Sequence, residues 1–277
     1  MSASKVGFIG LGNMGKPMAK RLLSHGFEVT SCAHVRREAI EELKRLGLVE
    51  LASPQEVAHA SDVTITMVRD THESEVVILG ERGVLHGMGE GSTLIMMSTI
   101  YPDFCQRVAQ LAAARGVQVL DSPVSGGPMG VERGTLALMV GGDEGVIEGC
   151  RPILEAMGRI FHCGGVGMGM VTKLANNAVL FVTAAILSEA IVLARAYGMA
   201  EERLLDIFKN ASANSWAVQN WEFMKWVRDS YIPGDLGTTM GLAMKDLRTC
   251  LDVANRKEIR MPLTAVVSHL DWSVYRE

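Results

Sequence analysis

The sequence predicts an α/β protein in which an N-terminal doubly wound sheet is followed by an all-α C-terminal domain. Short β-rich apolar runs alternate with stretches of helical period from Lys5 to about Cys163, which indicates βαβ units. From Met168 to Tyr275 there is no convincing alternating run, only long stretches of helical spacing. The sequence pattern changes from alternating strands and helices to helices alone at Gly164-Gly165-Val166-Gly167. We therefore expect one domain over residues 1–165 and a second over 166–277.

Each expected strand is an apolar run, and the helices between them carry recognisable start signals. Ser53-Pro54-Gln55-Glu56 combines an N-cap, a proline at the first helical position and a capping-box glutamate, and Pro102-Asp103 opens another helix. The alternation predicts a parallel sheet. The expected strands are Val6–Ile9, Glu28–Cys32, Val63–Val68, Thr93–Met97, Val117–Leu120 and Leu136–Val140.

The first helix of the second half, roughly Met168 to Tyr197, is apolar almost all round. Such a helix is enclosed by other elements or by a second subunit, so we expect a homodimer or a homotetramer. Its most membrane-like stretch, Ala178 to Leu187, is about half of the roughly 20 residues that span a bilayer, which predicts a helix buried in protein. Breaks near Ser212–Asn214 and Pro233–Gly234 separate the later helices.

Composition limits the partners and the compartment. The chain has 277 residues, 48% of them hydrophobic, which excludes intrinsic disorder. Its net charge of -4, from 27 basic and 31 acidic residues, provides no broad cationic surface for nucleic acid. The five cysteines show neither zinc spacing nor disulfide density, and no metal site is expected. With no recognisable targeting signal, the expected location is cytoplasmic.

A glycine-rich turn follows the first strand directly and opens an apolar helix that runs to His25. The turn reads Gly10-Leu11-Gly12-Asn13-Met14-Gly15 and matches the G-x-G-x-x-G pattern in its proper context. Gly10 allows the tight turn, Gly12 lets the backbone approach a pyrophosphate, and Gly15 permits close packing of helix on sheet. The helix N-terminus supplies N–H groups to phosphates, so the sequence predicts a Rossmann-type dinucleotide-binding domain.

The end of the second strand indicates which dinucleotide binds. An acidic residue is expected there when NAD is used, because its carboxylate binds the ribose hydroxyls. The sequence instead reads Cys32-Ala33-His34-Val35-Arg36-Arg37, without an acid and with two guanidinium groups that could pair with a 2′-phosphate. This favours NADP, with NAD possible and His34 also assigned to the cofactor. The alternative is that Arg36 and Arg37 are a solvated helix start.

Asp121-Ser122-Pro123-Val124-Ser125-Gly126-Gly127 comes straight off a strand, where open α/β sheets place ligand sites. The Ser125 hydroxyl and the backbone N–H groups of Gly126 and Gly127 form a compact donor set for a substrate carboxylate. The alternative is a tight turn that needs glycine dihedral angles.

Lys173 and Asn177 are four residues apart near the start of the long apolar helix, so both project from one face. A lysine in a partly dehydrated site has its charged form disfavoured, which lowers its pKa and makes it a usable acid/base near neutral pH. Lys173 is therefore the acid/base candidate. The alternative is an ordinary lysine at a helix end whose charged head reaches solvent.

The glycine turn, the Asp121 to Gly127 segment and the Lys173–Asn177 pair, in this order, resemble the β-hydroxyacid dehydrogenase family over nearly the whole chain. Its members include 3-hydroxyisobutyrate dehydrogenase and tartronate semialdehyde reductase. The resemblance extends to Ser98-Thr99-Ile100 and to Lys245-Asp246 on a late helix. It implies an NAD(P)-dependent oxidoreductase that interconverts a small hydroxy acid and its aldehyde or keto acid, built as a Rossmann domain followed by a helical substrate and oligomerisation domain.

The resemblance also implies roles for single residues. Asn177 would orient the reacting oxygen, Thr99 would lie beside the nicotinamide ribose, and Lys245 would sit near both nicotinamide and substrate. The expected cofactor site also includes Met67 and Val68 at the end of a strand. Where the family often has a Phe seven residues before the late lysine, this chain has Thr238, so transfer of a particular substrate by analogy is weak.

Other functions remain possible at this point. An imine reductase generally lacks a lysine at the position of Lys173, and a 6-phosphogluconate dehydrogenase needs a much larger helical domain and has a His where this chain has Asn176. A non-catalytic Rossmann module that binds a partner is a third alternative. Trp216 and Trp221 border a pocket, a subunit interface or simply the core.

Overall fold

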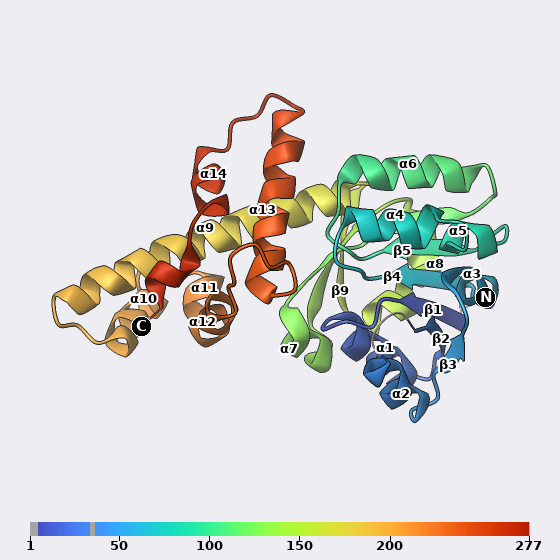
Figure 1. The fold of residues 1–277 in the computed structure, drawn as a ribbon, viewed down its shortest axis with the longest axis horizontal. Helices are drawn as coiled ribbons and strands as arrows, with labels where there is room; N and C mark the ends of the chain where they lie inside the picture. Colours follow the sequence, from blue (N-terminus) through green and yellow to red (C-terminus); the bar gives the residue numbers. More distant parts are fainter. Residues whose placement is uncertain (1–4, 34–36, 277) are drawn as a thin grey trace. The chain divides into compact units, whose positions relative to one another are not determined.

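The structure is a computed structural model that describes residues 5–33 and 37–276. It divides into two compact units, Met1–Lys173 and Leu174–Glu277. The division falls inside the long helix α9 (Met168–Ala196), whereas the sequence places the boundary near residue 165. Each unit is described by itself, with the labels of Figure 1.

The first unit is built on one twisted mixed sheet, with strand order β3-β2-β1-β4-β5-β6-β8-β7 and β9 paired with β8. The six strands from β3 to β6 are parallel, which confirms the doubly wound core of the prediction. The strands are β1 (Lys5–Ile9), β2 (Glu28–Cys32), β3 (Val49–Leu51), β4 (Val63–Thr66), β5 (Thr93–Met96), β6 (Gln118–Asp121), β7 (Val124–Ser125), β8 (Leu136–Gly141) and β9 (Gly158–Gly164).

The edge of the sheet beyond β6 differs from the predicted all-parallel arrangement. Strand β8 runs antiparallel to β6 and to β7, and it is parallel only to β9. The prediction of a fully parallel sheet is therefore wrong here, because the short β7 pairs back on β8 before a parallel crossover can form. Strands β3, β7 and β9 were not expected, since two are very short and β9 carries Arg159 and His162 between terminal glycines.

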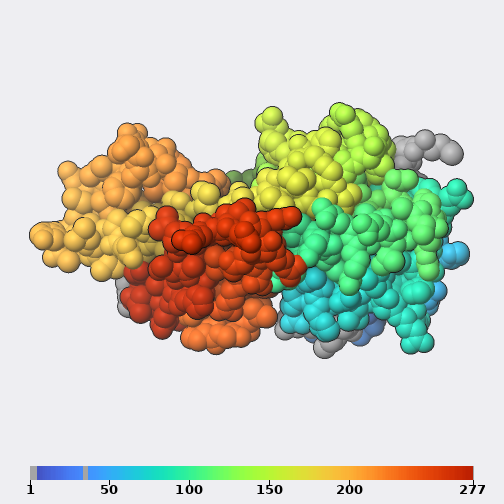
Figure 2. Space-filling model, turned by 90° about the horizontal axis from the view of Figure 1, so that it is seen from above, coloured from blue at the N-terminus to red at the C-terminus, as the bar shows by residue number. Residues whose placement is uncertain are grey.

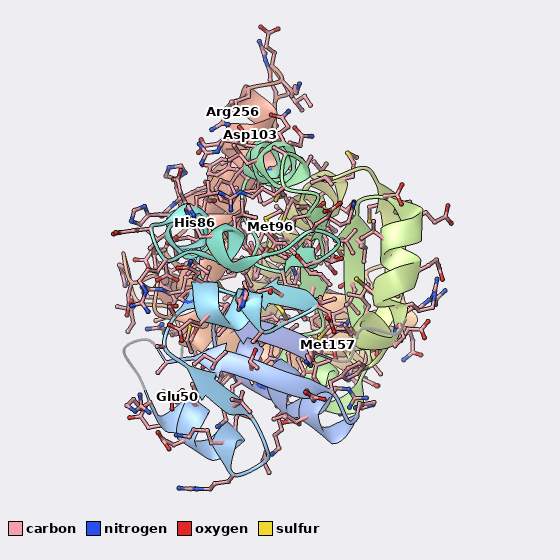
Figure 3. The ribbon with its side chains drawn as sticks, turned by 90° about the vertical axis from the view of Figure 1, so that its right-hand side faces the viewer. Glu50, His86, Met96, Asp103, Met157 and Arg256 are labelled. Atoms are coloured by element: carbon pink, nitrogen blue, oxygen red, sulfur yellow. The ribbon has the colours of Figure 1, made fainter. Side chains whose placement is uncertain are left out.

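Helices cover both faces of the sheet, as the side-chain alternation of the strands requires. In β5, Ile95 packs on one face while Leu94 and Met96 pack on the other, and Figure 3 shows Met96 within this unit. The first face carries α1 (Gly15–Ser24), α2 (Glu38–Lys44), α7 (Gly127–Arg133) and α8 (Glu144–Glu155). The second face carries α3 (Pro54–His59), α4 (Thr71–Leu79), α5 (Val84–Gly87) and α6 (Pro102–Ala113).

Local chemistry starts these helices where the sequence predicts. The Ser53 hydroxyl accepts the Glu56 N–H at 3.2 Å, and the Glu56 carboxylate accepts the Ala52 N–H at 3.2 Å, which makes a capping box one residue offset. Pro102 is the first residue of α6. Figure 2 looks onto α6 (green) beside the blue-green α4 and α5, where Arg107 of α6 pairs with Glu75 of α4.

Helices joined by turns and loops make up the described part of the second unit, which contains no strand, as predicted. A buried cluster that includes Phe181, Trp221 and Trp272 forms its core. Trp221 is 3% exposed and its indole N–H donates to Glu201 at 2.7 Å, so Trp221 is a core residue, whereas Trp216 is half exposed. After α9 come α10 (Glu201–Asn210), α11 (Trp216–Gln219), α12 (Trp221–Asp229), α13 (Thr239–Asn255), α14 (Pro262–Ser268) and a 3₁₀ turn (Trp272–Tyr275).

The apolar part of α9 is longer than the sequence reading of Ala178 to Leu187. The helix has 29 residues, and an 18-residue window within it has a mean hydropathy of 2.0, enough by length and composition to cross a membrane. A core helix of a soluble protein passes the same test, and 44% of this window is already buried inside the chain. The rest includes an exposed row of Val179, Ile186 and Leu193, which we call the α9 stripe.

Candidate active site

The glycine turn after β1 has one glycine for each task that the sequence predicts. Gly10 has φ +100°, and a Cβ there would lie 2.1 Å from the carbonyl oxygen of Met67. A Cβ on Gly15 would lie 1.8 Å from the carbonyl oxygen of Gly10, so Gly15 lets α1 start against the turn. A Cβ on Gly12 would meet nothing within 4 Å. Gly10 and Gly15 are thus needed by the fold, while Gly12 leaves backbone open to a ligand.

The start of α1 suits an anion. The helix has no acidic residue in its first turn and no side-chain cap on its first N–H groups. Leu11 and Met14 pack against the core, whereas Asn13 is exposed. The turn therefore presents backbone donors with a positive potential, and these residues fit a pyrophosphate.

Two neighbouring strand ends meet the turn. The Met67 N–H donates to the Ile9 carbonyl at 2.8 Å, and the Val68 N–H donates to the hydroxyl of the buried Ser98 at 2.8 Å. The carboxyl ends of β1, β4 and β5 are thereby tied together, as ligand sites of this sheet class require. Met67, Val68 and Thr99 lie at this edge, and their roles in cofactor binding stay predictions. Ser98, to which the sequence analysis gave no separate role, ties Val68 to the end of β5.

The residues after β2 are only partly described. His34 and Arg36 lie outside the described residues. The Arg37 guanidinium pairs with Glu41 at 2.7 Å and with Glu50 at 3.0 Å, and Glu50 also binds Lys44 at 2.9 Å. Figure 3 shows Glu50 on β3 at this side of the sheet. Arg37 is therefore already neutralised by two carboxylates of its own chain.

The predicted carboxylate-binding segment follows β6 through the short strand β7. Ser125 pairs with Ala137 of β8 and is half-buried, which fixes its backbone. Gly126 has φ +131° and Gly127 has φ +63°, so both glycines are required by the backbone conformation. The dihedral explanation for the two glycines is thus correct, and it is compatible with the donor role, which stays a prediction.

Asp121, the last residue of β6, has more contacts than the sequence reading gave it. Its carboxylate is fully buried and accepts the N–H of Gly167 at 2.6 Å and the N–H of Met170 at 2.8 Å. Burial raises the pKa of the Asp121 carboxyl to about 6, although these hydrogen bonds oppose the rise. The sequence feature that could have indicated a role for Asp121 is its position, since it is an acid at a strand end just before the predicted substrate segment.

The two predicted residues of α9 lie one helical turn apart. Lys173 is half-buried, and Asn177 is 5% exposed. The Asn177 amide donates to Asp246 Oδ2 at 2.7 Å, and its oxygen accepts from Asn176 at 3.1 Å. The orientation of the Asn177 amide is therefore fixed within the helical unit.

Lys245, on α13, shares the same acid. Its Nζ lies 2.7 Å from Asp246 Oδ1, so one buried carboxylate binds Lys245 through one oxygen and Asn177 through the other. The structure thus brings together Asn177 and Lys245, and it adds Asp246, whose position beside Lys245 was the sequence signal.

Thr238 is the N-cap of α13, and its hydroxyl accepts the Gly241 N–H at 2.9 Å.

The sheet topology, the glycine turn at the ends of parallel strands and the open backbone at Gly12 define a dinucleotide-binding α/β protein. Two family models match nearly the whole chain. The NAD binding domain of 6-phosphogluconate dehydrogenase matches residues 5–169, and the NAD-binding domain of NADP-dependent 3-hydroxyisobutyrate dehydrogenase matches residues 167–275.

Curated relatives and a solved structure agree with these models. The chain is 36% identical to 2-(hydroxymethyl)glutarate dehydrogenase of Eubacterium barkeri, over 96% of this chain and 87% of that one. It is 35% identical to 2-hydroxy-3-oxopropionate reductase of Escherichia coli, over 96% and 89%. The structure of Mycobacterium tuberculosis 3-hydroxyisobutyrate dehydrogenase with L-serine superposes with a TM-score of 0.80 at 31% identity, over 98% and 92%.

The chain belongs to the β-hydroxyacid dehydrogenase family, which includes 3-hydroxyisobutyrate dehydrogenase. It is an NAD(P)-dependent dehydrogenase or reductase of that family. These relatives favour this function over the imine reductase that the sequence left open.

Proposed function

We propose that the chain interconverts a small hydroxy acid and its aldehyde or keto acid, with Lys173 as the general acid/base. The observation that carries this proposal is the pair on α9. Lys173 is half-buried, and Asn177, one turn further on, has its amide fixed by the buried Asp246. Two polar groups on one face of a mostly apolar helix are suited to act on a single substrate oxygen.

In this mechanism the nicotinamide ring, when bound, supplies or accepts the hydride. Lys173 Nζ takes the hydroxyl proton during oxidation and returns it to the nascent alkoxide oxygen during reduction. The Asn177 amide nitrogen carries two N–H donors, of which one binds Asp246 and the other is assigned to the reacting oxygen. Because Asp246 fixes that amide, no reorganisation of Asn177 is needed as charge develops.

The substrate carboxylate is assigned to the Ser125 hydroxyl and the N–H groups of Gly126 and Gly127. The substrates named for the relatives support this class. 2-(Hydroxymethyl)glutarate, 2-hydroxy-3-oxopropionate and 3-hydroxyisobutyrate are all carboxylates with a hydroxyl or an aldehyde a few bonds away.

NADP is the preferred dinucleotide in this proposal, because none of the five residues directly after β2, 33–37, is an acid that would repel a 2′-phosphate. Arg36 is the phosphate-binding residue, since Arg37 is paired with Glu41 and Glu50. NAD remains usable, because the glycine turn holds only the shared pyrophosphate.

The α9 stripe is assigned to a second copy of this chain in a homodimer or homotetramer. Val179, Ile186 and Leu193 recur every seven residues and are 69%, 59% and 63% exposed. This spacing matches the seam by which helices pack on one another. A cytoplasmic location is proposed as well, in keeping with five free cysteines.

Replacement of Lys173 by Ala tests the proposed chemistry. The dinucleotide Kd should stay nearly unchanged, because the glycine turn and the strand ends bind it. The kcat should fall by roughly 10²–10⁴-fold, as expected for the loss of a general acid/base. Near wild-type turnover by Lys173→Ala would show that Lys173 is not the acid/base.

A further inference from the structure

The buried Asp121 carboxylate is committed to the first turn of α9. Oδ1 accepts the Gly167 N–H at 2.6 Å and Oδ2 accepts the Met170 N–H at 2.8 Å. Both bonds are buried, and both acceptors belong to the residue that ends β6. One side chain of the sheet thus binds two amides that are three residues apart, that of Gly167 just before α9 and that of Met170 in its first turn.

Two glycines make room for the Asp121 carboxylate and its two hydrogen bonds. A Cβ on Gly141, the residue of β8 that pairs with Asp121, would lie 2.3 Å from Asp121 Oδ1. A Cβ on Gly169 would lie 2.2 Å from the Met139 carbonyl oxygen and 2.8 Å from Asp121 Oδ2. Neither position has room for a side chain, so the carboxylate, the sheet and the start of the helix are closely packed.

The two hydrogen bonds of Asp121 link the segment that holds Ser125 to the segment that holds Lys173, and the proposed function gives these segments separate tasks. Asp121 lies four residues before Ser125, and Met170 lies three residues before Lys173. Three helical residues span only about 4.5 Å along the axis, so the amide held by Asp121 and the backbone of Lys173 move together. Two bonds to amides three residues apart fix both the axial position and the rotation of this turn.

We propose that Asp121 is a positioning residue for Lys173, setting the first turn of α9 against the strand end that leads into Ser125–Gly127. This inference rests on the proposed function of Lys173. Proton transfer requires the Lys173 nitrogen within hydrogen-bond reach of the substrate oxygen, and a displacement of about 1 Å costs about 10²-fold in rate.

Asp121→Asn is the primary variant, because it keeps the shape but turns one acceptor into an N–H group that faces a backbone N–H. Its matched control is Asp143→Asn. Asp143 Oδ1 likewise accepts two amides at a helix start, Gly145 at 2.8 Å and Val146 at 3.2 Å, but it caps α8 and lies in no proposed site. We expect Asp121→Asn to lower kcat at least about tenfold with the NADPH Kd within about twofold, and Asp143→Asn to change neither.

A double-mutant cycle separates positioning from general damage to the fold. In a Lys173→Ala background, Asp121→Asn should have no further effect on the residual rate, because the group that it positions is gone. An equal loss in both backgrounds would show a merely structural role and overturn the proposal, as would a wild-type kcat in Asp121→Asn alone. Asp121→Glu, one methylene longer with both acceptors kept, is the second variant should Asp121→Asn not fold, and the same cycle applies to it.

The single variants also distinguish the two proposals. If Lys173→Ala turns over at the wild-type rate, the proposed function of Lys173 fails, and the positioning role fails with it. If Lys173→Ala is impaired while Asp121→Asn is not, only the positioning role is overturned.

Discussion

Arg36 and Arg37 are adjacent in the sequence, but we expect only Arg36 to select the dinucleotide. Arg37 is held by Glu41 and Glu50, so a 2′-phosphate would have to displace two carboxylates to bind it. Arg36→Ala should raise the KM for NADPH several-fold more than the KM for NADH, and Arg37→Ala, as its matched control, should change their ratio little. A wild-type kcat/KM that is higher with NADH than with NADPH would contradict the preference itself.

Asp121 should make stability depend on pH in a direction unusual for an acid. Burial raises the pKa of its carboxyl from 3.8 to about 6, so between these values the folded chain keeps a proton that the unfolded chain has released. Folding stability contributed by this group is therefore lost as pH rises from about 4 to about 6, by roughly 3 kcal/mol at about 1.4 kcal/mol per pKa unit.

Urea unfolding of wild type and Asp121→Asn across pH 4–7 measures this contribution as a difference. Cys105 interacts electrostatically with Asp121, and burial holds the pKa of its thiol well above its ordinary value. Cys105 is present in both proteins, so its contribution cancels in the difference. A difference that stays constant with pH would show that Asp121 titrates at its ordinary pKa.

At the scale of elements, the turn between β1 and α1 separates glycines that the fold needs from the one that a ligand needs. A Cβ on Gly12 meets no protein atom within 4 Å, so Gly12→Ala should leave the Tm unchanged. The new methyl group would stand where the pyrophosphate approaches, so the NADPH Kd should rise at least about tenfold, or about 1.4 kcal/mol.

Gly149→Ala is the matched control for Gly12→Ala. Gly149 also has open space at its Cβ position, but it lies inside α8. Alanine there should stabilise the helix by about 0.5–1 kcal/mol and leave the NADPH Kd unchanged. An unchanged Kd in Gly12→Ala would remove Gly12 from the dinucleotide site.

The elements that the sequence predicts correctly are those with strong local signals. The runs Val6–Ile9 and Thr93–Met97 are continuous apolar strands, and the Ser53 and Pro102 starts carry their own caps, so periodicity and capping suffice. The direction of β8 depends on pairing with the two-residue β7, a tertiary contact that no local pattern encodes. For the same reason the three-residue β3 escapes prediction.

The residues of the candidate site likewise divide into those that a local motif predicts and those whose contacts are long-range in the sequence. Gly10, Gly12 and Gly15 follow from a motif whose spacing states its mechanism. The partners of Asp121 and Asp246 could not be predicted, because each bonds groups more than forty residues away in the sequence. Such contacts become visible only when the chain is folded.

The assembly of the whole molecule should depend on the α9 stripe. Ile186→Glu places a charge on a surface that the proposed second copy desolvates, which costs several kcal/mol without a partner charge. Light scattering at micromolar concentration should give a dimer or tetramer for wild type and a shift toward the 30.0 kDa monomer for this variant. Val76→Glu, at a 58% exposed position of α4, is the control and should leave the mass unchanged. A monomeric wild type would contradict the assembly.

The central claim concerns the substrate of the whole enzyme, a small acid that carries the reacting carbonyl or hydroxyl. Without its carboxylate, a substrate leaves the donors of Ser125, Gly126 and Gly127 unpaired, at a cost of about 1–3 kcal/mol for each buried donor. The most direct measurement compares kcat/KM with NADPH for a semialdehyde, such as succinic, methylmalonic or tartronic semialdehyde, and for its neutral aldehyde analogue. We predict at least about a tenfold preference for the semialdehyde and a smaller preference in Ser125→Ala. Equal kcat/KM values, or a preference that Ser125→Ala leaves intact, would contradict the carboxylate site.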